Sequence, residues 1–164
     1  MRHLILLRHA KSSWDARGLE DIDRPLNARG ERDAPIMAAR LRDHGFHPQR
    51  IVCSTARRTR ATAAAFVATL NVDASRVTYS EDLYLASVST ALGIIGATPS
   101  GVTDLMLVGH NPGCTELANS LGDTRIDNVP TCGCVVLGLP VDEWTQVSSL
   151  RGKTVWFDYP KRPH

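Results

Sequence analysis

Arginine and histidine side chains stand just beyond three short apolar runs of the sequence. Arg8 and His9 follow HLILL, Arg58 comes four residues after RIVCS, and His110 follows DLMLVG. A guanidinium stays protonated and presents forked N–H donors that match phosphate oxygens. An imidazole kept neutral by neighbouring cationic charge adds a lone pair that can attack phosphorus. If the fold brings these four side chains together, their chemistry is phosphoryl binding with a histidine nucleophile.

The three apolar runs are predicted to be strands of one sheet. HLILL is apolar almost throughout, which is typical of a central strand covered on both faces. Helical spacing of apolar residues follows each run, and this alternation predicts a largely parallel sheet with helices on both faces. The predicted strands are 3–7, 50–54, 77–79, 104–110, 132–139 and 153–159, and the predicted helices are 27–45, 56–70, 87–97 and one beginning at Pro112.

The last two predicted strands are joined without a helix. We therefore expect them to be an antiparallel or edge addition to the parallel strands. The predicted fold class is α/β, with a single domain over residues 1–164. Its architecture is three layers, α/β/α, around a mostly parallel mixed sheet.

The carboxyl ends of the strands are where an open α/β sheet binds its ligands. Arg8, His9, Arg58 and His110 are therefore expected to meet at that edge, as the catalytic residues. Neighbouring residues on a strand point to opposite faces, so the strand has to end at His9 for the first two to share a site. Helix starts nearby would add amide donors. The predicted substrate-binding residues are Lys11, Ser12, Ser54 and Asn111, although either serine could instead cap backbone amides.

Composition limits the classes of partner and cofactor. Hydrophobic residues make up 43% and charged residues 22% of the 164 residues, which is ordinary for a folded domain, and the net charge of +2 gives no argument for nucleic acid or a membrane. The first apolar run is too short for a signal peptide or a membrane span, so a cytoplasmic chain with reduced cysteines is expected. Cys132 and Cys134 lack a second ligand pair at a recognised spacing, and we predict no metal and no cofactor.

Four stretches of the sequence resemble motifs of the histidine phosphatase superfamily, also called phosphoglycerate mutase-like. LLRHAKSSW is similar to its RHG motif, CSTARRTRATA to its second motif, and VGHNPG to its second histidine motif. DIDRPLNARG resembles a loop of the small SixA-type phosphohistidine phosphatases. The resemblance implies a phosphoglycerate mutase-like fold, His9 as the phosphorylated nucleophile, and Arg58 rather than Arg57 as the pocket arginine.

The sequence departs from the wider family in three respects, one of which is Asp15, where many mutase-like members have asparagine. Ala10 replaces the glycine of the RHG triplet, and the stretch from Ala63 to Gly109 is too short for the capping insertion that many relatives carry. We therefore expect no large cap and an open, shallow pocket. The general acid is not clearly marked: Glu81 and Asp82 are the candidates by position, and the further options are Asp15, Asp21 and Asp23.

These observations favour a metal-independent phosphatase that works through a phosphohistidine enzyme intermediate. An open pocket and an uncertain acid favour phosphohistidine on a protein as the substrate, because imidazole departs more easily than an alkoxide. The alternative is a phosphatase of small phosphoesters such as a nucleotide or sugar phosphate, and a non-catalytic phosphate-binding adaptor is disfavoured by the intact His9. The expected partner is a phosphorylated protein or small phosphorylated substrate, and a monomer is the simplest assembly.

Overall fold

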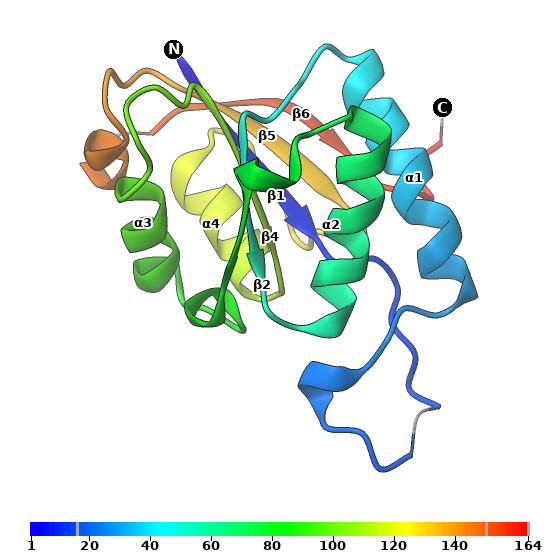
Figure 1. The fold of residues 1–164 in the computed structure, drawn as a ribbon. Helices are drawn as coiled ribbons and strands as arrows, with labels where there is room; N and C mark the ends of the chain where they lie inside the picture. Colours follow the sequence, from blue (N-terminus) through cyan, green and yellow to red (C-terminus); the bar gives the residue numbers. More distant parts are fainter. Residues whose placement is uncertain (16, 150, 164) are drawn as a thin grey trace.

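A six-stranded sheet forms the middle layer of the structure, a computed structural model that describes residues 1–15, 17–149 and 151–163 (Figure 1). The strands are β1 (Arg2–Arg8), β2 (Arg50–Ser54), β3 (Val77–Ser80), β4 (Asp104–Gly109), β5 (Cys134–Leu139) and β6 (Lys153–Asp158). Their order in the sheet is β3-β2-β4-β1-β5-β6. The first four are parallel, β5 is antiparallel to β1, and β6 is antiparallel to β5. The predicted antiparallel addition is confirmed.

Two pairs of helices cover the two faces of the sheet. α1 (Ala28–Asp43) and α2 (Arg57–Leu70) pack on one face, and α3 (Val88–Gly96) and α4 (Gly113–Leu121) pack on the other (Figure 1). The connections contain the short 3-10 helices η1 (Asp21–Asp23), η2 (Ala74–Arg76), η3 (Glu81–Leu83) and η4 (Trp144–Ser149). The three-layer α/β/α architecture is thus the one expected. None of the helices in the described part of the chain has the length and apolar character needed to cross a membrane.

Strand β1 shows how the apolar run builds both halves of the core. Leu4 and Leu6 pack against α3 and α4, whereas Ile5 and Leu7 pack against α1 and α2. All four are almost completely buried. Each such side chain stabilises the fold by about 1.5–3 kcal/mol relative to leaving it exposed. A strand that faces two helical layers has to be apolar at consecutive positions, which explains the absence of alternation in HLILL.

The chain between β1 and α1 forms a long first loop (residues 11–27) that projects beyond the carboxyl ends of the strands (Figure 1). Its base is closed, since the N–H of Asn27 donates to the carbonyl of Lys11 over 3.0 Å. The Asn27 side chain also caps α1 by accepting from the N–H of Gly30. Gly30 lies so close to the other side of the loop that a Cβ there would be 2.2 Å from the Lys11 carbonyl oxygen. The loop is therefore anchored where it leaves the body.

Candidate active site

The carboxyl ends of three neighbouring strands hold the arginines and histidines singled out by the sequence. β4 lies between β1 and β2, and the N–H of His9 donates to the carbonyl of Gly109 over 3.1 Å. β1 ends at Arg8, so the pleat ends where the two adjacent side chains have to share one site. The ring centroids of His9 and His110 are 5.5 Å apart. The structure therefore brings together side chains that are about a hundred residues apart in the sequence.

The hydrogen bond of His9 determines which ring nitrogen is free. Its Nδ1 is 2.7 Å from the carbonyl oxygen of Ala10, and a carbonyl can only accept, so Nδ1 carries the proton. Nε2 then holds the lone pair. Burial, and then the positive charges of Arg58, Arg8 and Arg24, lower the pKa of His9 to about 4. His9 is consequently a neutral imidazole at pH 7. Neighbouring charge was the expected cause, but burial is the larger one.

His110 is held between a guanidinium and a hydroxyl. Nη2 of Arg58 lies 3.4 Å from Nδ1 of His110, and Nε2 lies 2.8 Å from Oγ of Ser54. Because a guanidinium can only donate, Nδ1 is the acceptor and Nε2–H donates to Ser54. Burial and the charge of Arg58 lower the pKa of His110 to about 3. The second histidine is therefore also neutral.

Two guanidinium groups at this site carry buried donors that the protein does not satisfy. Nη1 of Arg8 donates to the carbonyl of Val129 over 3.0 Å, and Arg58 donates to Asp21. The Nε atoms of both arginines are buried and have no hydrogen-bond partner among the described residues. A buried donor without an acceptor costs about 1–3 kcal/mol, and more for a charged group. An anion with several oxygens is the ligand that would satisfy both arginines at once.

Asp21 of the first loop completes this cluster, and its role was not foreseen from the sequence. Its carboxylate accepts hydrogen bonds from Tyr84, Arg58 and Arg24. The hydroxyl of Tyr84 and then the two guanidinium groups hold the pKa of Asp21 well below its usual range. An ionised carboxylate is a poor general acid, so the structure argues against that option for Asp21. The only sequence signal was the resemblance of DIDRPLNARG, which marks the loop but assigns no contact.

The general-acid candidates Glu81 and Asp82 are not brought into the cluster. Both are exposed on η3, and no hydrogen bond or ion pair within the described residues joins either to His9 or His110. η3 is a single short turn, and Tyr84, immediately after it, is the side chain that points to the site. The ring of Tyr84 meets that of His110 edge-on, with centroids 5.3 Å apart. Tyr84, rather than Glu81 or Asp82, is thus the side chain of this segment that contacts the cluster. The two remaining options, Asp15 and Asp23, are also exposed.

The predicted substrate-binding residues occupy different positions. Ser54 holds His110, whereas Ser12 is buried and accepts from Nη1 of Arg24 over 2.8 Å. Asn111 donates to the carbonyl of Val129, the same carbonyl that holds Arg8, so it shapes the wall behind that arginine. Lys11 is half-buried at the base of the first loop.

The two histidines of the cluster are largely buried. His9 and His110 are only 7% and 5% exposed. No capping insertion is present, because α2, β3, α3 and β4 account for the chain between the second and third motifs. The first loop instead supplies a wall through Asp21, which lies against Arg58. The absence of a large cap agrees with the expectation, and Asp21 of the first loop borders the cluster on this side.

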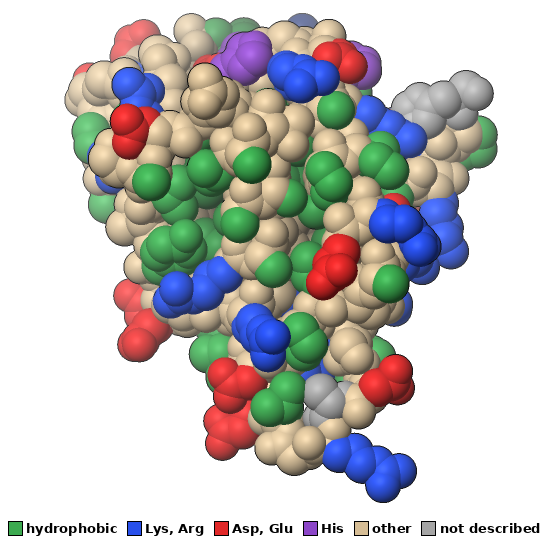
Figure 2. Space-filling view, turned by 45° about the vertical axis from the view of Figure 1, so that its right-hand side comes forward, with side chains coloured by type: hydrophobic (Ala, Val, Ile, Leu, Met, Phe, Trp, Pro, Cys, Tyr) green, Lys and Arg blue, Asp and Glu red, His purple; other side chains and the backbone are tan. Residues whose placement is uncertain are grey.

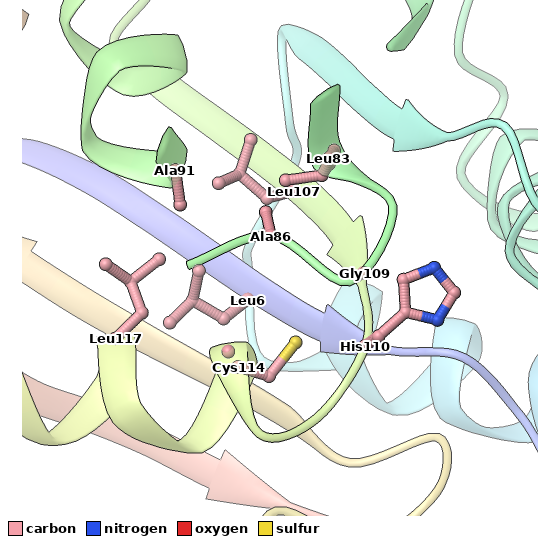
Figure 3. A pocket seen from close by; sticks show the side chains of 10 residues that line it. Leu6, Leu83, Ala86, Ala91, Leu107, Gly109, His110, Cys114 and Leu117 are labelled. Atoms are coloured by element: carbon pink, nitrogen blue, oxygen red, sulfur yellow. The ribbon is translucent and has the colours of Figure 1, made fainter. Parts of the chain in front are cut away.

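A small apolar cavity of about 20 Å³ lies next to this cluster, and His110 is one of its lining residues. Figure 3 shows it between Leu6, Leu107 and Leu117, with the ring of His110 turned away from it. The four cysteines are buried free thiols, including Cys114 beside this cavity. No group of three or more potential metal ligands is found in the described part of the chain.

Comparison with known proteins identifies the family. The model of the histidine phosphatase superfamily (branch 1) matches residues 4–84. A structure from Agrobacterium tumefaciens, assigned by its name to phosphohistidine phosphatase SixA, is 32% identical, covers 97% of this chain and 99% of its own, and superposes with a TM-score of 0.81. A structure from Nakamurella multipartitia with the same assignment is 27% identical over 98% of this chain and 97% of its own, with a TM-score of 0.84.

The likeness also extends to a plant protein. An uncharacterized chloroplastic protein of Arabidopsis thaliana is 37% identical over 164 residues, which is 94% of this chain and 74% of its own length. The chain thus matches SixA-type proteins in sequence and in fold over nearly its whole length. It belongs to the histidine phosphatase superfamily, in the SixA-type branch.

Proposed function

We propose that the protein is a phosphatase in which His9 is the nucleophile. The observation that carries this proposal is the pair of buried, unpartnered Nε donors of Arg8 and Arg58 beside a neutral imidazole whose Nε2 is free. Two guanidinium groups can hold the oxygens of a phosphoryl group while the lone pair of Nε2 faces phosphorus. The arrangement therefore supplies both binding and attack.

The reaction proceeds in two displacements. In the first, Nε2 of His9 forms a bond to phosphorus, and the bond from phosphorus to the leaving group breaks, with its electron pair going to that group. In the second, water attacks phosphorus, the bond to Nε2 breaks, and inorganic phosphate leaves with regeneration of the neutral imidazole. The arginines stabilise the charge on the equatorial oxygens in both steps.

Ser54 gives His110 a second protonation pattern that suits this chemistry. A serine hydroxyl can either accept from Nε2 of His110 or donate to it. In the other tautomer Nε2 has lost its proton to water and Nδ1 has taken one up, so the hydroxyl donates to Nε2 and Nδ1–H can donate to an oxyanion. His110 can thus follow the developing charge while it stays neutral overall.

Phosphohistidine on a protein is the proposed substrate. The side chains closest to the two histidines include no carboxylic acid ready to protonate an alkoxide, since Asp21 is held ionised and Glu81 lies outside the cluster. An imidazole leaving group depends less on such an acid than an alkoxide does. The SixA assignment carried by the Agrobacterium and Nakamurella relatives supports the same substrate class.

The test compares two kinds of substrate and two histidine variants. The purified protein is assayed on a histidine-phosphorylated protein, on free phosphohistidine and on a panel of phosphate monoesters. His9→Ala is expected to abolish turnover and the acid-labile labelling of the enzyme by substrate phosphate, whereas the exposed control His47→Ala is expected to keep both. Full activity of His9→Ala would overturn the mechanism. Turnover confined to one small ester would overturn the substrate.

A further inference from the structure

The first loop (residues 11–27) presents a large aromatic side chain to solvent beside the candidate active site. Trp14 is 75% exposed, more than any other large hydrophobic residue described. Figures 1 and 2 show the loop as a projection below the body, past the carboxyl ends of the strands. Its own Asp21 contacts Arg58, so the projection is tied to the phosphate-binding side of the molecule.

The exposed indole is held in place. The guanidinium carbon of Arg24 lies 3.7 Å from the centroid of the Trp14 ring. Arg24 is fixed in turn by hydrogen bonds to Oγ of Ser12, to the carbonyl of Ser13 and to the carboxylate of Asp21. A continuous series of contacts therefore runs from Trp14 through Arg24 and Asp21 to Arg58. An aromatic side chain that is already ordered loses little freedom when another molecule covers it.

A second exposed apolar side chain follows a residue that contacts the first loop. Leu85 is 55% exposed and directly follows Tyr84, whose hydroxyl reaches Asp21. Leu85 has a φ of 50°, a left-handed conformation that leucine rarely adopts, and which leaves its side chain in solvent. Trp14 and Leu85 are thus exposed apolar side chains on two segments that meet at the carboxylate of Asp21.

The charges on the projection do not favour one sign of partner. Residues 11–24 contain three basic and four acidic side chains, and Figure 2 shows both kinds on this projection. Electrostatic steering by the loop is therefore weak. Ordered, exposed aromatic residues are the usual centres of binding energy at protein interfaces. The surface suits apolar contact with a folded partner.

We propose that Trp14, assisted by Leu85, is a docking contact for the folded protein that carries the phosphorylated histidine. The inference rests on the proposed function, because a phosphoryl group bound by Arg8 and Arg58 brings the surface around its own carrier against this rim. Trp14 contacts neither the phosphoryl group nor His9. It distinguishes phosphohistidine on a protein from the same group on the free amino acid.

The experiment measures kcat/KM of Trp14→Ala on two substrates with the same leaving group. One is a histidine phosphotransfer protein phosphorylated with phosphoramidate, and the other is free phosphohistidine. We expect kcat/KM to fall about tenfold on the protein and to stay unchanged on the free amino acid, since the loss of one interface aromatic has that size. Leu85→Ala is expected to give a smaller loss in the same direction, and Trp14→Phe to restore most of the activity.

A matched control is available on the body of the protein. Ile36 is 48% exposed on α1, and Ile36→Ala is expected to leave both substrates unchanged. An equal loss on both substrates in Trp14→Ala would show that Trp14 only supports Arg58 through Arg24, and would overturn docking. No loss on either would also overturn it. Failure of the proposed function would give a different result. Either the wild-type protein would not hydrolyse phosphohistidine, or His9→Ala would remain active.

Discussion

Asp21 and Arg58 are joined along one edge of the guanidinium by two hydrogen bonds. Nη1 donates to the backbone carbonyl of Asp21 over 2.6 Å, and Nη2 donates to its carboxylate over 2.9 Å. Nε of Arg58 has no hydrogen-bond partner among the described residues, and Nη2 also lies 3.4 Å from Nδ1 of His110. The aspartate thus fixes the guanidinium of Arg58 beside His110.

This relationship predicts that Asp21 positions Arg58 for phosphoryl binding. Asp21→Ala should lower kcat/KM at least about tenfold, mainly by raising KM, because a misplaced guanidinium loses its bidentate contact with the phosphoryl group. Asp21→Asn should keep more activity, since the amide oxygen still accepts from Nη2. Steady-state kinetics on free phosphohistidine would separate KM from kcat. Asp23→Asn, on the same short helix and exposed, is the control, and a loss of the same size there would contradict the assignment.

The two adjacent arginines at the start of α2 are expected to behave differently. Arg57 is exposed, whereas Arg58 is 3% exposed and lies beside His110. Arg58→Lys keeps the positive charge but loses the paired N–H donors of the guanidinium group, so vanadate should bind at least about tenfold more weakly. Arg57→Ala should leave vanadate binding unchanged. Isothermal titration with vanadate measures both, and circular dichroism checks that Arg58→Lys is folded. If wild type and Arg58→Lys bound vanadate with equal affinity, Arg58 would not be a phosphate-binding residue.

The strands and helices were predictable because local rules decide them. Asn27 was expected to open a helix and does cap α1, and the consecutive apolar residues of HLILL require a strand covered on both faces. The convergence of His9 and His110 followed from strand ends that meet at one edge. The place of β1 between β4 and β5 depends on long-range pairing, which no local pattern records.

The surroundings of the histidines were harder to predict, because an irregular loop supplies them. The first loop has no repeating pattern of apolar residues from which its conformation could be predicted. The contact from Asp21 to Arg58 could therefore not be derived from residue spacing. Glu81 and Asp82 were candidates by position, but the turn of η3 leaves both exposed, and Tyr84 after it donates to Asp21. A shift of two or three residues in a short turn changes which side chain reaches the site.

The neutral state of both histidines predicts how they titrate. Burial and nearby guanidinium charge lower the pKa to about 4 for His9 and to about 3 for His110, against about 6.5 in an unfolded chain. Histidine nitrogen shifts followed by NMR should therefore show both rings unprotonated from pH 8 down to about pH 5. Titration of either ring above about pH 6 would contradict the buried, neutral arrangement.

The same shifts set the direction of the change in stability with pH. Between about pH 6.5 and pH 4 the unfolded chain binds protons on these two histidines and the folded chain does not. The free energy of unfolding should consequently fall as the pH falls through this window. Above about pH 6.5 both states hold neutral rings, and this contribution is constant. Urea unfolding of wild type and His9→Asn across the window would test this, with a shallower dependence expected for the variant.

The closed base of the first loop gives a stability prediction with an internal control. A Cβ on Gly30 would lie 2.2 Å from the carbonyl oxygen of Lys11, which is backbone and cannot move aside without opening the loop. Gly30→Ala should therefore destabilise the protein by about 1–3 kcal/mol and lower Tm by several degrees. Gly93, within α3, has nothing within 4 Å of its added Cβ, so Gly93→Ala should stabilise by about 0.5–1 kcal/mol. Because the first loop also carries Asp21 to Arg58, Gly30→Ala should weaken vanadate binding, whereas Gly93→Ala should not. A Gly30→Ala protein with unchanged Tm and unchanged vanadate affinity would show that the loop base does not position the arginine.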